Sequence, residues 1–318
     1  MKEFLYHIVY AAFYAFSRLP YKVLYFLSDI FYLITYYIVR YRRDIVRRNI
    51  TTSFPEKTLE ECISIEKDFY RWFCDYFLET IKLMSVSRKE LMRHIEFRNV
   101  EEIEACFDKG QTCAAILGHY CNWEFLSATG LAFQRHNEAV CGLIYHPLHN
   151  HLFDRLFIKM RQSMGGICIP KKDILRYLVS FRNQNLMNLF GYIADQSPKF
   201  QNIHLWLPFL NHETPVFTGA ERLMKKMGNA VFYVDMERPK RGKYICTFRL
   251  ITTDPDSMPE FEITRKFFIM LEDTIRRNPR YYLWTHDRWK RTREKFDREF
   301  KMENGHVVKK SADEDFRQ

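Results

Sequence analysis

Hydrophobic residues in the middle of the chain form short continuous runs, and segments with helical spacing separate these runs. The runs predict β-strands at 112–118, 139–145, 187–194, 229–235 and 243–252. The intervening and following segments predict helices at 122–134, 149–164, 171–182, 217–227 and 259–277. Continuous apolar runs indicate strands that are covered on both faces. We therefore predict an α/β fold with a mixed, largely parallel sheet covered by helices on both faces.

The N-terminus carries two apolar stretches, roughly 4–18 and 21–39. The second stretch has about the 20 residues that a membrane span needs, although it contains Lys22 and Asp29. Several arginines follow within residues 40–48, which is typical of a cytoplasmic flank. We predict an N-terminal membrane-anchor helix or helical hairpin. Two alternatives stay open: a hairpin that covers an apolar face of a soluble enzyme, and a helix that lies in the membrane interface.

The remaining chain divides into two further parts. Residues 56–84 have apolar and aromatic side chains on one helical face, and Pro55 is expected to begin this helix. A short helix is expected near residues 101–108. The sequence becomes polar from about Glu303 and predicts a disordered tail. The predicted domains are an anchor with its basic flank (1–48), a catalytic domain (49–302) and a polar tail (303–318).

Composition narrows the classes of partner. The 318 residues carry a formal net charge of +10, and 16% of them are aromatic, which favours an anionic partner met at an apolar surface. No recognisable base-reading module supports a nucleic-acid partner. The eight cysteines include no CxxC pair and are interpreted as reduced thiols rather than zinc ligands.

A histidine and a glutamate lie where the first predicted strand meets the next helix. His119 follows the run 112–118, at the strand end where α/β sheets bind ligands. Asn122 is expected to cap the helix that follows, and Glu124 to turn back and hydrogen bond the imidazole. A carboxylate in this position fixes the tautomer of a histidine and makes it a general base. The sequence therefore predicts a His119/Glu124 dyad.

The alternative is a purely structural role, with His119 a satisfied buried histidine and Glu124 a charge in the first turn of a helix. No serine lies in a G-x-S-x-G turn, and Cys121 has no obvious activating neighbour. A catalytic dyad would therefore activate a group of the substrate and not a nucleophile of the enzyme.

Five ordered blocks of the sequence are similar to the motifs of one known family. They are GHYCNWEF (118–125), YHPLHNHLFDRLFIKMRQSMGG (145–166), YIADQSPK (192–199), LPFLNHETPVFTGAERLMKKMGNAVFYV (207–234) and NPRYYLWTHDRWKRT (278–292). The first resembles the H-x-x-N-W-E motif of the bacterial lipid A biosynthesis acyltransferases, which belong to the wider H-x4-D/E acyltransferases. The resemblance covers nearly everything after the anchor.

The resemblance implies transfer of a fatty acyl chain from acyl carrier protein to a hydroxyl of a lipid A precursor. His119, oriented by Glu124, would remove the hydroxyl proton as the oxygen attacks the thioester, without an acyl-enzyme. No cofactor is expected, because the donor carries its own phosphopantetheine. The implied partners are acyl carrier protein, the lipid acceptor and the membrane, with the catalytic domain on the cytoplasmic face of the bacterial inner membrane. Coenzyme A stays open as the donor carrier.

Further residues are candidates for substrate binding. Asn150, Asp154 and Arg161 share one helical face, and the resemblance implies that Arg161 contacts phosphate or the donor carrier while Asp154 orients it. Asp195 and Gln196 follow the predicted strand 187–194 and are expected to position the acceptor, with a capping role for Asp195 as the alternative.

The C-terminal block adds a basic cluster. It includes Arg288, is interleaved with tryptophans, and is expected to meet anionic headgroups or an acidic carrier protein, or else to form a solvated helix. No metal site is predicted, because the spacing of His146, His149 and His151 fits no single helical or strand face.

Three departures from the family pattern leave the acceptor open. His146-Pro147 stands where the family has Arg-Pro, Leu210-Asn211-His212 stands where it has small residues, and Ser197-Pro198 follows Asp195-Gln196. An aminolipid, a lysophospholipid or a glycolipid is the alternative acceptor for the same chemistry. A non-catalytic lipid-binding protein and a thioesterase-like hydrolase are the remaining alternatives.

Overall fold

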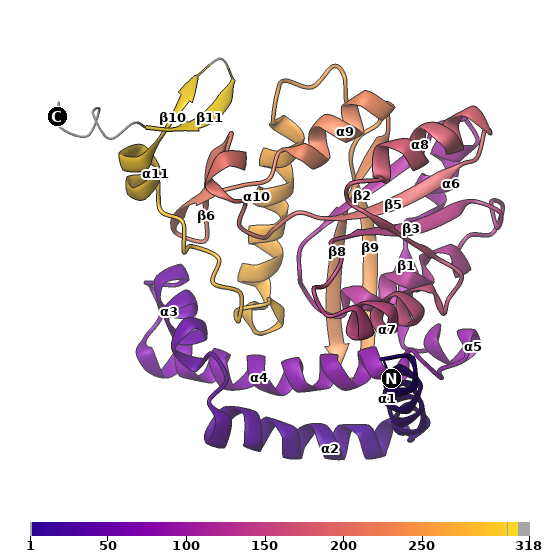
Figure 1. The fold of residues 1–318 in the computed structure, drawn as a ribbon, viewed down its shortest axis with the longest axis vertical. Helices are drawn as coiled ribbons and strands as arrows, with labels where there is room; N and C mark the ends of the chain where they lie inside the picture. Colours follow the sequence, from indigo (N-terminus) through magenta and orange to yellow (C-terminus); the bar gives the residue numbers. More distant parts are fainter. Residues whose placement is uncertain (1, 304, 311–318) are drawn as a thin grey trace.

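The computed structural model describes residues 2–303 and 305–310 and confirms the predicted α/β fold. Its main sheet has the order β1-β9-β8-β2-β5-β3-β4, in which every neighbouring pair is parallel except the hairpin β8-β9 (Figure 1). These strands are β1 (Ile95–Arg98), β2 (Cys113–Leu117), β3 (Val140–Tyr145), β4 (Ile167–Pro170), β5 (Asn188–Ile193), β8 (Ala230–Lys240) and β9 (Lys243–Thr252). The edge strands β1 and β4 were not predicted, because each has only four residues.

Helices flank the sheet, and most lie where the sequence predicts them. They are α4 (Leu59–Lys82), α5 (Arg88–Leu91), α6 (Val100–Phe107), α7 (His151–Gln162), α8 (Ile174–Asn183), α9 (Gly219–Met227), α10 (Glu262–Arg277) and the short 3-10 turns η3 (Phe200–Asn202) and η4 (Pro279–Tyr281). The segment predicted as a helix at 122–134 is instead a 3-10 helix, η2 (Trp123–Leu131). Both α6 and α10 contact the central strand β2, all five residues of which are buried.

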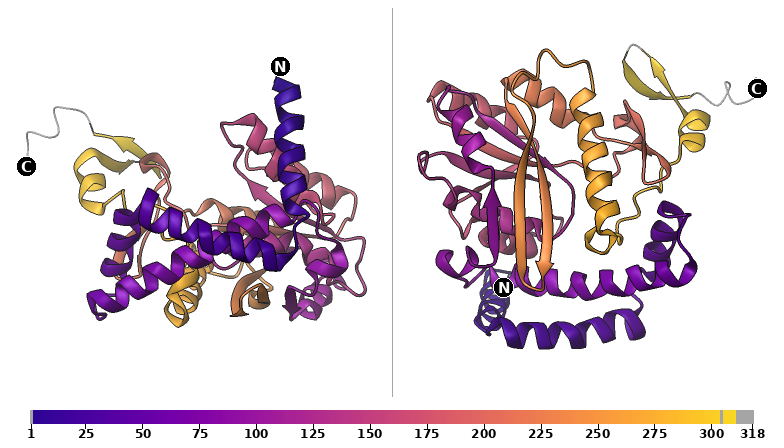
Figure 2. Two further views of the ribbon diagram at one scale, coloured as in Figure 1. Left: turned by 90° about the horizontal axis from the view of Figure 1, so that it is seen from below. Right: turned by 180° about the vertical axis from the view of Figure 1, so that it is seen from behind.

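The N-terminal region is helical, as predicted. It consists of α1 (Lys2–Ser17), α2 (Tyr21–Leu33), the π-helix η1 (Ile34–Val39) that continues α2, and α3 (Arg43–Ser53). Figure 2 shows that α1 turns away from the direction of α2. Among the described residues, Tyr21–Val39 is the one helical segment long and apolar enough to span a bilayer, and only 22% of it is buried. The domain boundary predicted at residue 48 falls within α3 and stays a prediction.

The long helix α4 begins at a capping box and not at Pro55. The hydroxyl of Thr58 accepts from the backbone N–H of Glu61, and the Glu61 carboxylate accepts from the backbone N–H of Thr58. This reciprocal pair satisfies two N–H groups that a helix start leaves without partners. The motif T-L-E-E is visible in the sequence, so the start could have been predicted from it.

Two small antiparallel hairpins complete the chain. They are β6-β7 (Trp206–Phe209 and His212–Pro215) and β10-β11 (Phe300–Glu303 and His306–Lys309), the second following α11 (Arg293–Glu299). The predicted disorder from Glu303 is therefore wrong for residues 306–309. Val307 packs against a small apolar cluster that includes Phe296 and Phe300, which gives this hairpin a core of its own. Residues 311–318 of the predicted tail lie outside the described part of the chain.

Candidate active site

The register of two neighbouring strands brings a histidine and an aspartate together. In the parallel pair β2-β5, Leu117 lies beside Ile193. His119 and Asp195 each follow two residues later, so they leave the sheet side by side at its carboxyl edge. The Nδ1 of His119 lies 2.6 Å from Oδ1 of Asp195, and the backbone N–H of His119 donates to Oδ2 over 2.9 Å. Asp195 therefore holds both the ring and the main chain of the histidine.

This arrangement selects one tautomer of the imidazole. Asp195 is 2% exposed, and although burial raises the pKa of its carboxyl group, the charge and hydrogen bonds of His119 outweigh burial and lower it. An ionised Asp195 accepts from Nδ1–H and leaves the lone pair on Nε2. The side-chain amide of Gln196 donates to this Nε2 over 3.2 Å, and the edge of Trp123 packs against the ring. Nε2 is thus the atom that can take a proton from a substrate.

The predicted hydrogen bond between Glu124 and His119 is wrong. The side chain of Glu124 is buried, and its two carboxylate oxygens accept from Arg161 over 2.7 and 2.6 Å. The Tyr76 hydroxyl donates a longer bond of 3.4 Å to the same carboxylate. A guanidinium satisfies both oxygens of a buried carboxylate, whereas one imidazole N–H satisfies only one. The structure therefore contains two separate pairs, His119–Asp195 and Glu124–Arg161.

Asn122 occupies the N-cap position of η2, as predicted, but the expected capping by its side chain is wrong. It precedes η2, but its side chain makes no capping hydrogen bond. Its amide instead donates to Glu79 of α4 over 2.8 Å, and its Oδ1 has no partner among the described atoms. The same Glu79 also accepts from the hydroxyls of Tyr25 and Tyr244. This carboxylate links the loop after β2 to α2 and β9.

A buried ionic network extends from Glu79 along α4, and the sequence reasoning missed it. Arg238 of β8 donates to Asp75 over 2.6 Å and lies within 4.0 Å of Glu79. Arg241, in the β8-β9 turn, binds both Asp75 and Asp29 of α2. A signal was present, because Asp75 and Glu79 lie four residues apart within an otherwise aromatic helix face. Carboxylates in such a stripe require buried partners.

Asn150, Asp154 and Arg161 were predicted to act together on one helical face, but each has a different partner in the structure. Asn150 caps α7 by accepting from the backbone N–H groups of Leu152 and Phe153. Asp154 accepts from the backbone N–H of Leu148 over 2.8 Å and so fixes the loop before the helix. It does not orient Arg161, because Glu124 does. Whether any of these residues binds substrate stays a prediction.

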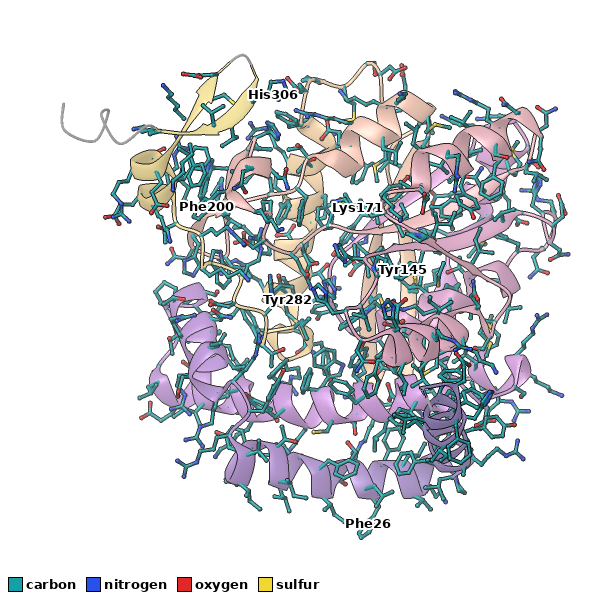
Figure 3. The ribbon with its side chains drawn as sticks, in the orientation of Figure 1. Phe26, Tyr145, Lys171, Phe200, Tyr282 and His306 are labelled. Atoms are coloured by element: carbon teal, nitrogen blue, oxygen red, sulfur yellow. The ribbon has the colours of Figure 1, made fainter. Side chains whose placement is uncertain are left out.

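Arg288 lies in the interior, 1% exposed, which does not fit its predicted contact with headgroups or a carrier protein. One of its nitrogens donates to the carbonyl of Pro215, and two others have no partner among the described atoms. Burial lowers the pKa of Arg288 to about 10, against the attraction of Tyr282 and Asp195. Tyr282 itself points into the interior (Figure 3). Arg288 therefore adds positive charge behind Asp195.

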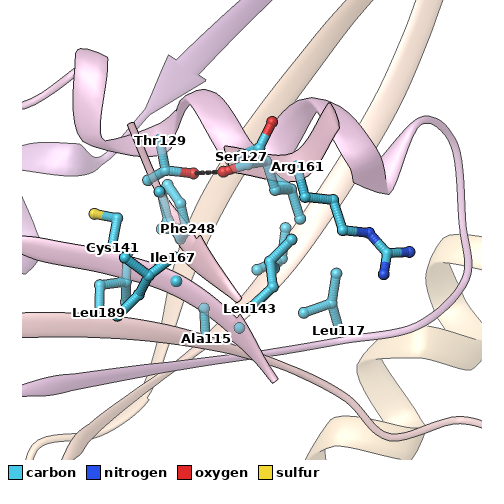
Figure 4. Close-up of a pocket in the computed structure, with 15 residues that line it drawn as sticks. Ala115, Leu117, Ser127, Thr129, Cys141, Leu143, Arg161, Ile167, Leu189 and Phe248 are labelled. Carbon is cyan, nitrogen blue, oxygen red and sulfur yellow. Dashed lines mark hydrogen bonds between the residues drawn. The ribbon is translucent and has the colours of Figure 1, made fainter. Parts of the chain in front are cut away.

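A narrow, mostly apolar pocket lies between β2, β3, β5 and η2, and of the two pairs only Arg161 lines it (Figure 4). Its cavity volume is about 30 Å³, far below the usual range for ligand pockets, about 300–1,000 Å³. Leu117, Leu143 and Phe248 line it together with Gly142 and Gly191, where an added Cβ would collide with a neighbouring side chain. The guanidinium of Arg161 points away from this apolar lining at one end (Figure 4). The lining is mostly apolar, but a hydrocarbon chain could enter only if the walls moved apart.

The three departures from the family pattern have different surroundings. His146 is exposed in the loop before α7. Leu210 and Asn211 form the turn of the β6-β7 hairpin with positive φ of 49° and 63°, and His212 stacks on Trp289. Ser197 donates its backbone N–H to Nε2 of His286, whose pKa burial lowers to about 4. The hairpin departure is thus part of local packing, whereas Ser197 lies next to the Asp195–Gln196 segment.

The site defines a class of enzyme. A buried aspartate orients an imidazole at the carboxyl edge of an α/β sheet, an arrangement typical of enzymes that use a histidine as general base. In the described part of the chain, no group of three or more histidine, cysteine, aspartate or glutamate side chains is arranged to hold a metal.

The comparison with known families specifies this class. The family model described as bacterial lipid A biosynthesis acyltransferase matches residues 1–291. The chain therefore belongs to the bacterial lipid A biosynthesis acyltransferases. No curated protein matches it.

Proposed function

We propose that this acyltransferase moves a fatty acyl chain from the thioester of acyl carrier protein to a hydroxyl of a lipid A precursor. His119 acts as the general base, Asp195 orients it, and the reaction takes place at the cytoplasmic face of the bacterial inner membrane. The observation that carries the proposal is the bond of 2.6 Å between Nδ1 of His119 and Asp195, which leaves the Nε2 lone pair for a substrate proton.

Proton transfer and bond formation follow from this geometry. Nε2 of His119 takes the hydroxyl proton as the acceptor oxygen attacks the thioester carbonyl carbon. The carbon–sulfur bond then breaks, and the departing thiolate takes the proton from the imidazolium. The ionised Asp195 stabilises the imidazolium in between. Gln196, whose amide meets Nε2 in the absence of substrate, is placed to position the acceptor hydroxyl.

We assign the apolar pocket to the acyl chain of the donor, whose binding requires the walls to move apart because the cavity volume is only about 30 Å³. Its lining is mostly apolar, and Arg161 at its end carries a charge that Glu124 neutralises. We assign Glu124 to holding Arg161 at the mouth of the pocket, where the thioester arm and its phosphate enter. Glu124 is thus a positioning residue for donor binding.

One observation favours an alternative acceptor. His146 is exposed at the position where the family has arginine, so this site lacks a permanent charge for a phosphorylated sugar. The same chemistry on an aminolipid, a lysophospholipid or a glycolipid is the second candidate function.

The test is acyl transfer in detergent micelles from labelled acyl carrier protein to a tetra-acylated lipid A precursor. Wild-type protein is expected to give product, and His119→Ala to give none above background. Product with other lipid acceptors alone would replace the acceptor and keep the chemistry. Acyl release without an acceptor would indicate a hydrolase, and no turnover with any acceptor would contradict the proposal.

A further inference from the structure

The N-terminal helices carry a one-sided pattern of burial. Along α2 and η1 the buried residues are Leu24, Ser28, Tyr32 and Tyr36, which recur every fourth position. Most of the other residues in this segment are exposed, including large apolar side chains. A spacing of four keeps one stripe of a helix against a single partner. The segment therefore lies lengthwise on the protein and presents its other faces outwards.

Polar side chains of the segment also contact α4 and the β8-β9 turn. Ser28 donates to Asp75 over 2.7 Å, and the hydroxyl of Tyr25 donates to Glu79 over 2.9 Å. Asp29, near the middle of the segment, pairs with Arg241 over 2.8 Å. If Tyr21–Val39 left α4 to cross a bilayer, the Asp29 carboxylate would enter the hydrocarbon core, and Asp75 and Glu79 would lose partners. Ionisable groups at that depth are costly without partners.

The opposite faces of α1, α2 and η1 are apolar. Phe4 is 72% exposed, Phe26 65% and Ile38 74%, and Phe26 points away from the body of the molecule (Figure 3). Both α1 and α2 lie along the side of the molecule that carries α4 (Figures 1 and 2). The same segments carry exposed cationic side chains, which are Arg18, Lys22 and Arg40. Apolar side chains with neighbouring cations fit the headgroup boundary of an anionic bilayer.

We propose that α1, α2 and η1 lie flat in the interface of an anionic bilayer and do not span it. The occupant of the apolar surface is the lipid itself.

The same geometry determines how far the active site lies above the lipid. Asp75 binds α2, whereas its neighbour Tyr76 bonds to Glu124, so a single layer, α4, separates the membrane helices from the site. A membrane-embedded acceptor would therefore need to rise by roughly one helix diameter, about 10 Å.

The test measures depth along the segment. Val23→Cys, Ile30→Cys and Ile38→Cys each carry a bimane label on an exposed position of the full chain. Unsubstituted protein treated in parallel gives the background from the native cysteines. Lys226→Cys, exposed on α9, serves as the solvent control. Quenching by doxyl lipids of known depth is measured in vesicles of phosphatidylcholine and phosphatidylglycerol.

A flat helix predicts equal, shallow depths for residues 23, 30 and 38, with no quenching at residue 226. A spanning helix places residues 23 and 38 about 22 Å apart along its axis and residue 30 near the bilayer centre. Much deeper quenching at residue 30 than at both ends would overturn the proposal. Absence of quenching at all three positions, as when a second copy of the chain covers the surface, would overturn it too. The readout is independent of acyl transfer, so it separates failure of this proposal from failure of the proposed function.

Discussion

Two carboxylates serve this site in contrasting ways. Asp195 holds an imidazole whose side chain is 16% exposed, and it leaves one ring nitrogen for chemistry. Glu124 holds a guanidinium with both oxygens, and little of its charge remains for anything else. Both carboxylates are buried, but only the imidazole has a ring nitrogen that can accept a proton, since arginine stays protonated and has no acceptor. In the proposed mechanism, therefore, the first pair transfers the proton and the second pair positions the donor.

The largest expected effect breaks the first pair. Asp195→Asn keeps the size of the side chain but removes the charge that selects the Nδ1–H tautomer of His119. Since general-base catalysis contributes about 10²–10⁴-fold, we expect kcat to fall by a factor in that range with little change in KM for the donor. Steady-state acyl transfer at saturating donor measures both constants. A kcat within threefold of wild type would contradict the role of Asp195.

Breaking the second pair should cost stability. Arg161→Ala leaves the buried Glu124 without its partner, and an unpaired buried charge typically costs about 3–5 kcal/mol. Urea denaturation in detergent measures the free energy of unfolding. The matched double variant Glu124→Gln/Arg161→Met removes both charges and should recover most of the lost free energy of unfolding. Its KM for the donor should be higher than that of wild type, because Arg161 is missing in it too. If the double variant were as unstable as the single one, the pair would not account for the effect.

A second histidine near Asp195, His286, predicts how stability depends on pH. Burial lowers the pKa of His286 to about 4, below the ordinary value of about 6.5. Between pH 4 and pH 6.5 the unfolded state therefore binds more protons than the folded state, so the free energy of unfolding rises with pH in this window. The stability that neutral His286 allows is fully present above pH 6.5 and is lost as the pH falls towards 4. Each pH unit in this window costs at most about 1.4 kcal/mol. The free energy of unfolding, compared at pH 7 and pH 5, should fall more for wild type than for His286→Gln. Equal falls would contradict the prediction.

The smallest expected effect concerns the apolar pocket that Arg161 lines at one end. A Cβ at Gly191 would approach Leu143 to 2.8 Å and push this side chain towards the cavity. Gly191→Ala should therefore shift the ratio of kcat/KM towards shorter acyl chains by about 10-fold per two-carbon step. Competition between dodecanoyl and tetradecanoyl donors measures the ratio. Gly219→Ala, with no atom within 4 Å of the new Cβ, is the control and should leave it unchanged.

The main sheet was predictable because its central strands are long, apolar and buried. His119 was predictable as a site residue from its place after such a strand. Its partner was not, because pairing β2 with β5 requires the strand order and register, and Asp195 is 76 residues away. Glu124 is close in sequence, but a 3-10 helix and the distant Arg161 determine where it points. Contacts between elements were thus the part that the sequence alone could not provide.

The central claim is that Asp195, and not Glu124, holds the imidazole of His119. Proton NMR of protein with ¹⁵N-labelled histidine, in detergent, observes the short Nδ1–H bond directly as a downfield resonance. The account predicts that this signal is present in wild type and in Glu124→Gln/Arg161→Met, and absent in Asp195→Asn and in His119→Gln. A signal that survives Asp195→Asn and disappears in the Glu124→Gln/Arg161→Met variant would contradict it.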